Sequence, residues 1–130
     1  MNKLTLTAAL LSALITAAHI FGGGPQYHEP VLASTWDAEN KAIYSILWHF
    51  ASLIMAINTV ALLSAALKHP APAVINLVAL QNLAFAALFI FYGWQRLDTI
   101  TLLPQWTVFL LIAALAFWGA HRAQQPSSAA

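Results

Sequence analysis

Cysteine is absent from this chain of 130 residues, and charge is scarce. Five basic and four acidic residues make up 7% of the sequence, against about 25% in an average soluble domain, while 61% of the residues are hydrophobic. So few charges cannot supply the polar surface that a small soluble domain needs, which excludes an ordinary soluble enzyme, a nucleic-acid-binding protein and a disordered chain. The lack of cysteine excludes disulfides, thiolate metal sites and covalent haem attachment.

The charged residues leave four long stretches that hold no Asp, Glu, Lys or Arg. They are residues 4–28, 42–67, 69–95 and 99–121. Each exceeds the ~20 residues that a helix needs to cross a hydrocarbon core. The sequence therefore predicts an all-α polytopic membrane protein, a four-helix transmembrane bundle in one domain over 1–123. The expected spans are about 3–21, 42–67, 72–95 and 103–121.

The basic residues predict the orientation of this bundle. With the N-terminus inside, Lys3, Lys68 and Arg122 are cytoplasmic, and Lys41 and Arg96 are external. Lysine and arginine are enriched on the cytoplasmic side of membrane proteins. We therefore expect both termini to be cytoplasmic, an N-in/C-in topology.

Local signals predict where the helices begin and end. Gly22-Gly23-Gly24-Pro25 predicts the end of the first helix, because glycine favours a helix C-cap and proline does not continue a helix. An external loop over 22–34 follows. Ser34-Thr35-Trp36-Asp37 resembles a capping box, with Ser34 as the N-cap of the second helix. His69 to Pro72 predicts a stiff turn, and residues 124–130 a flexible polar tail.

Small and polar residues form one stripe on each of the first two helices. They are Thr5, Ser12, Thr16 and His19 on the first, and Ser45, His49, Ser52, Ala56 and Thr59 on the second. In membranes such residues mark the faces on which helices pack. We therefore expect both stripes to face the interior, with His19 and His49 facing each other in the outer half.

Polar and aromatic residues gather at the predicted outer ends of the helices, whereas the inner half is almost wholly aliphatic. This asymmetry predicts a ligand pocket that opens outward. Its expected residues are His19, Gly22, Gly23, Gly24, Tyr44, Ser45, Trp48, His49, Ser52, Tyr92, Gln95, Gln105 and Trp106. The favoured interpretation is a non-enzymatic accessory or ligand-holding module without a cofactor.

Two other functions stay open at this point. One is a redox protein that binds a divalent metal or haem through His19 and His49, with His28 as a further ligand. The other is a transporter of small molecules or a membrane enzyme acting on a lipid-like substrate. No Asp or Glu lies inside a span, which argues against an ion-coupled pump. The expected surroundings are the lipid bilayer, with a membrane-protein partner or a second copy, and no nucleic acid.

Short motifs along most of the chain resemble a group of small four-span bacterial membrane proteins of unassigned role. They are His19-Ile20-Phe21-Gly22-Gly23-Gly24, Pro30-Val31-Leu32-Ala33-Ser34, Trp48-His49, Leu103-Pro104-Gln105-Trp106 and Trp118-Gly119. The resemblance implies the same fold and a bacterial cytoplasmic membrane. It also implies a shared site at His19, the glycine triplet, Trp48-His49 and Gln105-Trp106, and it assigns no activity.

Overall fold

The computed structural model describes residues 1–68 and 70–124, and all secondary structure in this part of the chain is helical. The elements are α1 (Lys3–Ala17), η1 (Ala18–His28), α2 (Glu29–Ala33), α3 (Ala38–Leu67), α4 (Pro72–Leu97) and α5 (Gln105–Gln124). Four helices, with α1, η1 and α2 joined into one, are long and apolar enough to cross a membrane. This confirms the predicted four-span architecture. His69 of the predicted turn and residues 125–130 of the predicted tail lie outside the described residues.

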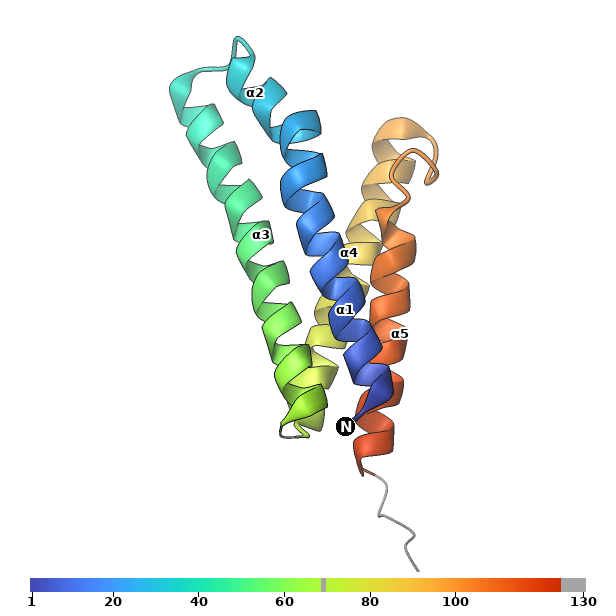
Figure 1. The fold of residues 1–130 in the computed structure, drawn as a ribbon. Helices are drawn as coiled ribbons and strands as arrows, with labels where there is room; N and C mark the ends of the chain where they lie inside the picture. Colours follow the sequence, from blue (N-terminus) through green and yellow to red (C-terminus); the bar gives the residue numbers. More distant parts are fainter. Residues whose placement is uncertain (69, 125–130) are drawn as a thin grey trace, which may run out of the picture.

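The helices form two antiparallel pairs that are close at one end and apart at the other (Figure 1). The helix from α1 to α2 pairs with α3, and α4 pairs with α5. At the end that holds the N-terminus, α1 also contacts α5 and α3 contacts α4. The pairs diverge toward η1 and the start of α5, so the bundle has a closed end and an open end.

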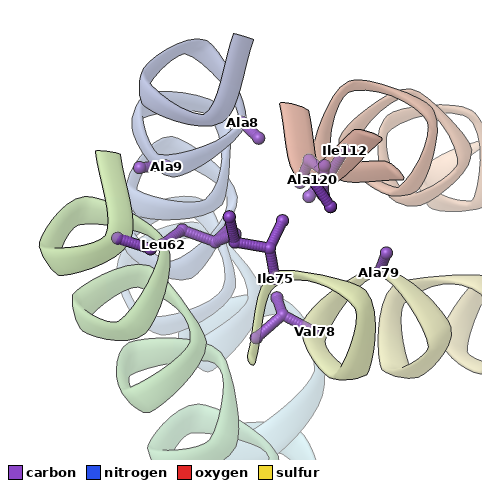
Figure 2. Packing of buried hydrophobic residues seen from close by; sticks show 10 residues of the cluster. Ala8, Ala9, Leu62, Ile75, Val78, Ala79, Ile112 and Ala120 are labelled. Carbon is purple, nitrogen blue, oxygen red and sulfur yellow. The ribbon is translucent and has the colours of Figure 1, made fainter. Parts of the chain in front are cut away.

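Small apolar side chains fill the closed end. The buried cluster comprises Ala8, Ala9, Leu62, Ala65, Ile75, Val78, Ala79, Ile112, Ala116 and Ala120. Figure 2 shows Leu62 of α3 and Ile75 of α4 meeting within it, between the four helices. Six of these ten residues are alanines, which let the helix backbones approach closely.

Asn2 forms hydrogen bonds with three helices at this end. Its side chain donates to the Gly119 carbonyl of α5 at 2.7 Å, and its backbone N–H donates to the Ala66 carbonyl of α3 at 3.1 Å. Its Oδ1 accepts from the Thr5 N–H and caps α1. These bonds satisfy backbone groups that a helix end would otherwise leave unpaired.

The predicted stripe on the first helix does face the interior. Thr5, Ser12 and Thr16 are buried. The hydroxyls of Ser12 and Thr59 hydrogen-bond at 2.8 Å, which joins this stripe to the one on α3. The Thr16 hydroxyl donates to the Ser12 carbonyl within its own helix.

The glycine triplet does not end the first helix, and the prediction of a loop from residue 22 is wrong. The chain continues as a π-helix, η1, and then as α2 to Ala33, so that residues 34–37 form the connection. Pro25 explains the change of helix type. In an α-helix its ring would clash with the carbonyl four residues earlier. Wider turns avoid that clash, as in the bond from the Glu29 N–H to the Gly24 carbonyl.

The predicted N-cap at Ser34 is also wrong. Ser34 is the C-cap of α2, and its hydroxyl donates to the Val31 carbonyl at 2.6 Å. Helix α3 begins at Ala38, and its N-cap is Asp37, whose carboxylate accepts bonds from the backbone N–H and side chain of Asn40. These bonds lower the pKa of Asp37. An aspartate is a better N-cap than a serine here because the charge of its carboxylate also interacts favourably with the helix dipole.

Candidate functional site

A pocket of about 440 Å³ lies where the two helix pairs diverge. All four membrane helices contribute to its wall. The lining residues are Ile15, Ala18, His19, Gly22, Gly23, Gln26, Tyr27, Tyr44, Trp48, Ala51, Met55, Phe85, Phe89, Leu103, Gln105 and Phe109. Its volume falls within the range of small-molecule sites, roughly 300–1,000 Å³.

Stacked rings from η1 and α3 form one wall. The His19 imidazole lies on the Trp48 indole, with 4.1 Å between ring centroids and 19° between planes. The His28 imidazole also stacks on Trp48, at 5.6 Å and 12°, and on Tyr44, at 6.0 Å and 15°. We call His19, Trp48, His28 and Tyr44 the ring stack. Stacked rings of this kind hold one another in place.

The π-helix makes this stack geometrically feasible. His19 and His28 are nine residues apart, which on an α-helix would place them about 180° from each other. The wider turns of η1 rotate the chain less per residue, and both imidazoles reach the same indole. π-Helical segments are rare and occur frequently at functional sites. The sequence prediction missed the role of His28 in the stack because it placed this residue in a loop.

Gly23 lets the π-helix backbone approach Trp48. A Cβ atom at Gly23 would lie 3.0 Å from Cη2 and 3.4 Å from Cζ2 of the indole. A Cβ at Gly22 or Gly24 would meet nothing within 4 Å. Of the triplet, only Gly23 is needed for close approach to the ring stack.

We expect Gly23→Ala to displace the Trp48 indole and Gly24→Ala to leave it in place. Both changes replace glycine by alanine, which restricts the backbone of the unfolded chain and alters the stability of an ordinary helix by roughly 0.5–1 kcal/mol. Only the first crowds a ring that is held between neighbours. The measurement is the indole N–H resonance of Trp48, which should move in the Gly23 variant alone. Equal movement in both variants would contradict this role of Gly23.

Phenylalanines of the second helix pair form the opposite wall. The Phe109 ring of α5 lies 5.4 Å from Phe85 and 5.7 Å from Phe89, both of α4. Met55 of α3 packs in the same buried cluster as Phe109. These side chains all line the pocket, and their surface is apolar.

Two residues that line this pocket each carry a polar atom that lacks a hydrogen-bond partner among the described residues. These atoms are Nε2 of His19, from the first helix pair, and Oε1 of Gln105, at the start of α5. Both atoms are buried. Buried polar groups in folded proteins are normally paired, so each unpaired atom calls for an explanation. None of the described lining residues is Asp, Glu, Lys or Arg.

His49 does not lie where the sequence predicted. Its side chain is exposed and contacts the His28 ring edge-on at 5.3 Å, while His28 Nε2 hydrogen-bonds to the Ser45 hydroxyl at 3.0 Å. The buried side of α3 runs through Met55 and Leu62. Thirteen positions separate His49 from Leu62, which places them about 140° apart. The prediction that His49 faces the interior is therefore wrong.

About half of the predicted pocket residues line the observed pocket. They are His19, Gly22, Gly23, Tyr44, Trp48 and Gln105. Those that do not line it are Gly24, Ser45, His49, Ser52, Tyr92, Gln95 and Trp106. The Ser52 hydroxyl donates to the Trp48 carbonyl one turn earlier in α3, and the Trp106 indole donates to the Ile100 carbonyl. Tyr92 and Gln95 are exposed on α4, away from the pocket.

Sequence reasoning missed most of the apolar lining. Gln26 and Tyr27, which also line the pocket, lie in the stretch for which the sequence predicts a loop. Phe85 and Phe89 have the four-residue spacing that puts two side chains on one helix face, yet nothing distinguished them from lipid-facing phenylalanines.

His19 and His28 each stack on Trp48, and His49 contacts His28 edge-on. Within residues 1–68 and 70–124, no three His, Cys, Asp or Glu side chains gather in a group that could hold a metal ion. Binding of metal or haem by His19, His49 and His28 stays a prediction.

Comparison with known proteins identifies no relative. No protein-family model, curated protein or solved structure matches the chain.

Proposed function

We propose that this chain is a small integral membrane protein that holds a small, mainly apolar molecule in the pocket between its two helix pairs. It acts as a ligand-holding module and not as an enzyme. One observation carries the proposal, a pocket of about 440 Å³ with aromatic walls, two of whose lining residues each hold a buried polar atom with no partner among the described residues. Largely apolar pockets with a few polar groups are typical ligand sites.

The composition of the pocket wall favours ligand binding over catalysis. The lining has no carboxylate, lysine or arginine and, since the chain has no cysteine, no thiol. Its one imidazole, His19, is stacked flat on Trp48. General acid–base catalysis requires a proton-transferring group placed against the reacting atom and usually a group that orients it. The wall instead offers flat surfaces and two hydrogen-bonding atoms.

The two methionines of the chain allow a direct binding test. Met55 lines the pocket and is 6% exposed, whereas Met1 is 80% exposed at the closed end. With methyl-labelled methionine in nanodiscs, we expect naphthalene to shift the Met55 methyl resonance saturably and to leave Met1 unchanged. The shift arises because an aromatic ring enters beside Met55.

Blocking the pocket provides the control. Ala51→Trp places a large side chain in the lining and should abolish the Met55 response. Ala18→Phe blocks the pocket from η1, the neighbouring helix of the same pair, and serves if the first variant folds poorly. Leu53→Trp adds the same ring on an exposed face of α3 and should bind like the native protein. A Met55 response that survives both blocking variants would show that the pocket is not the binding site.

We also infer that both termini lie on the cytoplasmic side, so that the pocket lies toward the external face. Lys3, Lys68 and Arg122 at the closed end support this orientation. A reporter active only in the cytoplasm should give a signal when fused to the C-terminus. Inserted in the connection after Ser34, the same reporter should be silent. The reverse pattern would invert the topology.

A further inference from the structure

The chemistry of the pocket wall limits what its ligand can be, provided that the ligand-holding function proposed above is correct. First, the ligand should be neutral. None of the described lining residues carries a carboxylate, ammonium or guanidinium group. A buried charge without a partner is strongly unfavourable. Carboxylates, phosphates and protonated amines therefore do not fit this wall.

Second, the ligand should be flat over most of its surface. The indole of Trp48 faces the pocket from one helix pair, and the rings of Phe85, Phe89 and Phe109 face it from the other. Aromatic rings pack best against other rings, in offset-stacked or edge-to-face arrangements. A planar ring can contact both walls at once.

Third, the ligand should bring a hydrogen to donate. Oε1 of Gln105 is an amide oxygen and only accepts hydrogen bonds. Nε2 of His19 donates or accepts, depending on the tautomer. Both residues line the pocket, and both atoms are buried without a partner among the described residues. A hydroxyl group is neutral, donates one hydrogen and also accepts, so it satisfies either atom.

From these three constraints we infer that the pocket binds a neutral, planar ring compound that bears a hydroxyl group, and that Gln105 and His19 recognise the hydroxyl. Because these residues come from different helix pairs, such a ligand would also bridge the open end of the bundle. The chain has no cysteine, so phenolic compounds and their oxidation products meet no thiol with which to form an adduct.

Three probes that differ only in their polar group test this inference by the Met55 methyl shift. Naphthalene has no hydrogen-bonding group, 2-methoxynaphthalene only accepts, and 2-naphthol both donates and accepts. Each probe is titrated at neutral pH into native protein and variants in nanodiscs of one lipid composition. For each probe, affinities are compared between native protein and variant, which cancels its partition into the bilayer.

Two variants remove the recognising atoms. Gln105→Leu removes the amide oxygen, and His19→Phe removes the nitrogen while keeping a ring against Trp48. We expect each variant to weaken 2-naphthol binding, by about tenfold for the hydrogen bond that is lost. Naphthalene binding should be unchanged or slightly tighter in both. Since 2-methoxynaphthalene cannot donate to Gln105, Gln105→Leu should leave its binding unchanged.

The outcomes separate this inference from the proposed function. If naphthalene binds saturably and 2-naphthol is insensitive to both variants, the pocket holds ligands but does not recognise a hydroxyl. Equal weakening of 2-methoxynaphthalene and 2-naphthol by Gln105→Leu would also overturn the inference, because a donated hydrogen would then be irrelevant. If no probe shifts Met55 saturably, the ligand-holding function itself fails.

Discussion

Gly119→Ala is expected to lower the free energy of unfolding by about 1–3 kcal/mol, the usual cost of overfilling a packed site. A Cβ atom at Gly119 would overlap Oγ1 of Thr5 on α1 and would lie 3.1 Å from the Thr5 backbone nitrogen. Rotation of the threonine side chain does not relieve the backbone contact. Helices α1 and α5 must therefore move apart, which also strains the bond from Asn2 to the Gly119 carbonyl. SDS titration in detergent, followed by circular dichroism, measures the loss.

A double-mutant cycle tests the assignment to Thr5. The Thr5 hydroxyl is buried and has no hydrogen-bond partner among the described residues, so Thr5→Ala alone should cost less than about 1 kcal/mol. Combined with Gly119→Ala, it should recover part of the lost stability, with a coupling of at least about 0.5 kcal/mol. Gly24→Ala, where a Cβ meets open space, is the matched control for glycine replacement. Additive effects of the two changes would contradict the proposed contact.

The membrane fold follows from the sequence because charge is so costly in hydrocarbon. The four uncharged stretches admit few alternatives, and the structure has a long apolar helix over each of them. The interior position of Thr5, Ser12 and Thr16 was also predictable. Without a hydrophobic drive between helices, small hydroxyl residues mark the face that packs.

The π-helix could not be predicted by the same rules. In water, three glycines and a proline favour a turn, because backbone groups released from the helix bind water. Within a bilayer those groups must stay paired inside the chain. In the structure the segment around Gly22 and Pro25 stays helical and changes its turn width. Two of the four contacts in the ring stack involve His28 and depend on this change, because His28 reaches Trp48 and Tyr44 only through η1.

The face of α3 that points into the bundle could not be predicted from the sequence either. The small polar stripe of α3 is not its buried face. The residues that pack against the other helices include Met55, Asn58 and Leu62. Thr59 lies at the edge of the stripe that adjoins the buried face, and its hydroxyl bonds with that of Ser12. His49 lies at the other edge of the stripe and is exposed. The chemistry of one helix therefore predicted which residues were unusual, but the neighbouring helices determined which way those residues faced.

Trp48→Ala is expected to destabilise the open end more than any other single change in the ring stack. The indole contacts His19, His28 and Tyr44 and packs against Gly23. Replacing a tryptophan by alanine costs roughly 3–5 kcal/mol in a buried site, and the half-buried Trp48 should lose about half of that. Because three glycines and a proline give η1 little stability of its own, the loss should be concentrated there.

Hydrogen exchange of the backbone amides measures where stability is lost. In Trp48→Ala, amides of η1 (Ala18–His28) should exchange faster, while those of α1 (Lys3–Ala17) keep their protection, because the closed end is held by a separate core. Trp48→Phe retains a ring and should show a smaller change. Trp118→Ala removes an indole that is 65% exposed and should leave exchange in η1 unchanged. Uniform acceleration along both α1 and η1 would show that Trp48 supports the whole bundle and not the pocket wall alone.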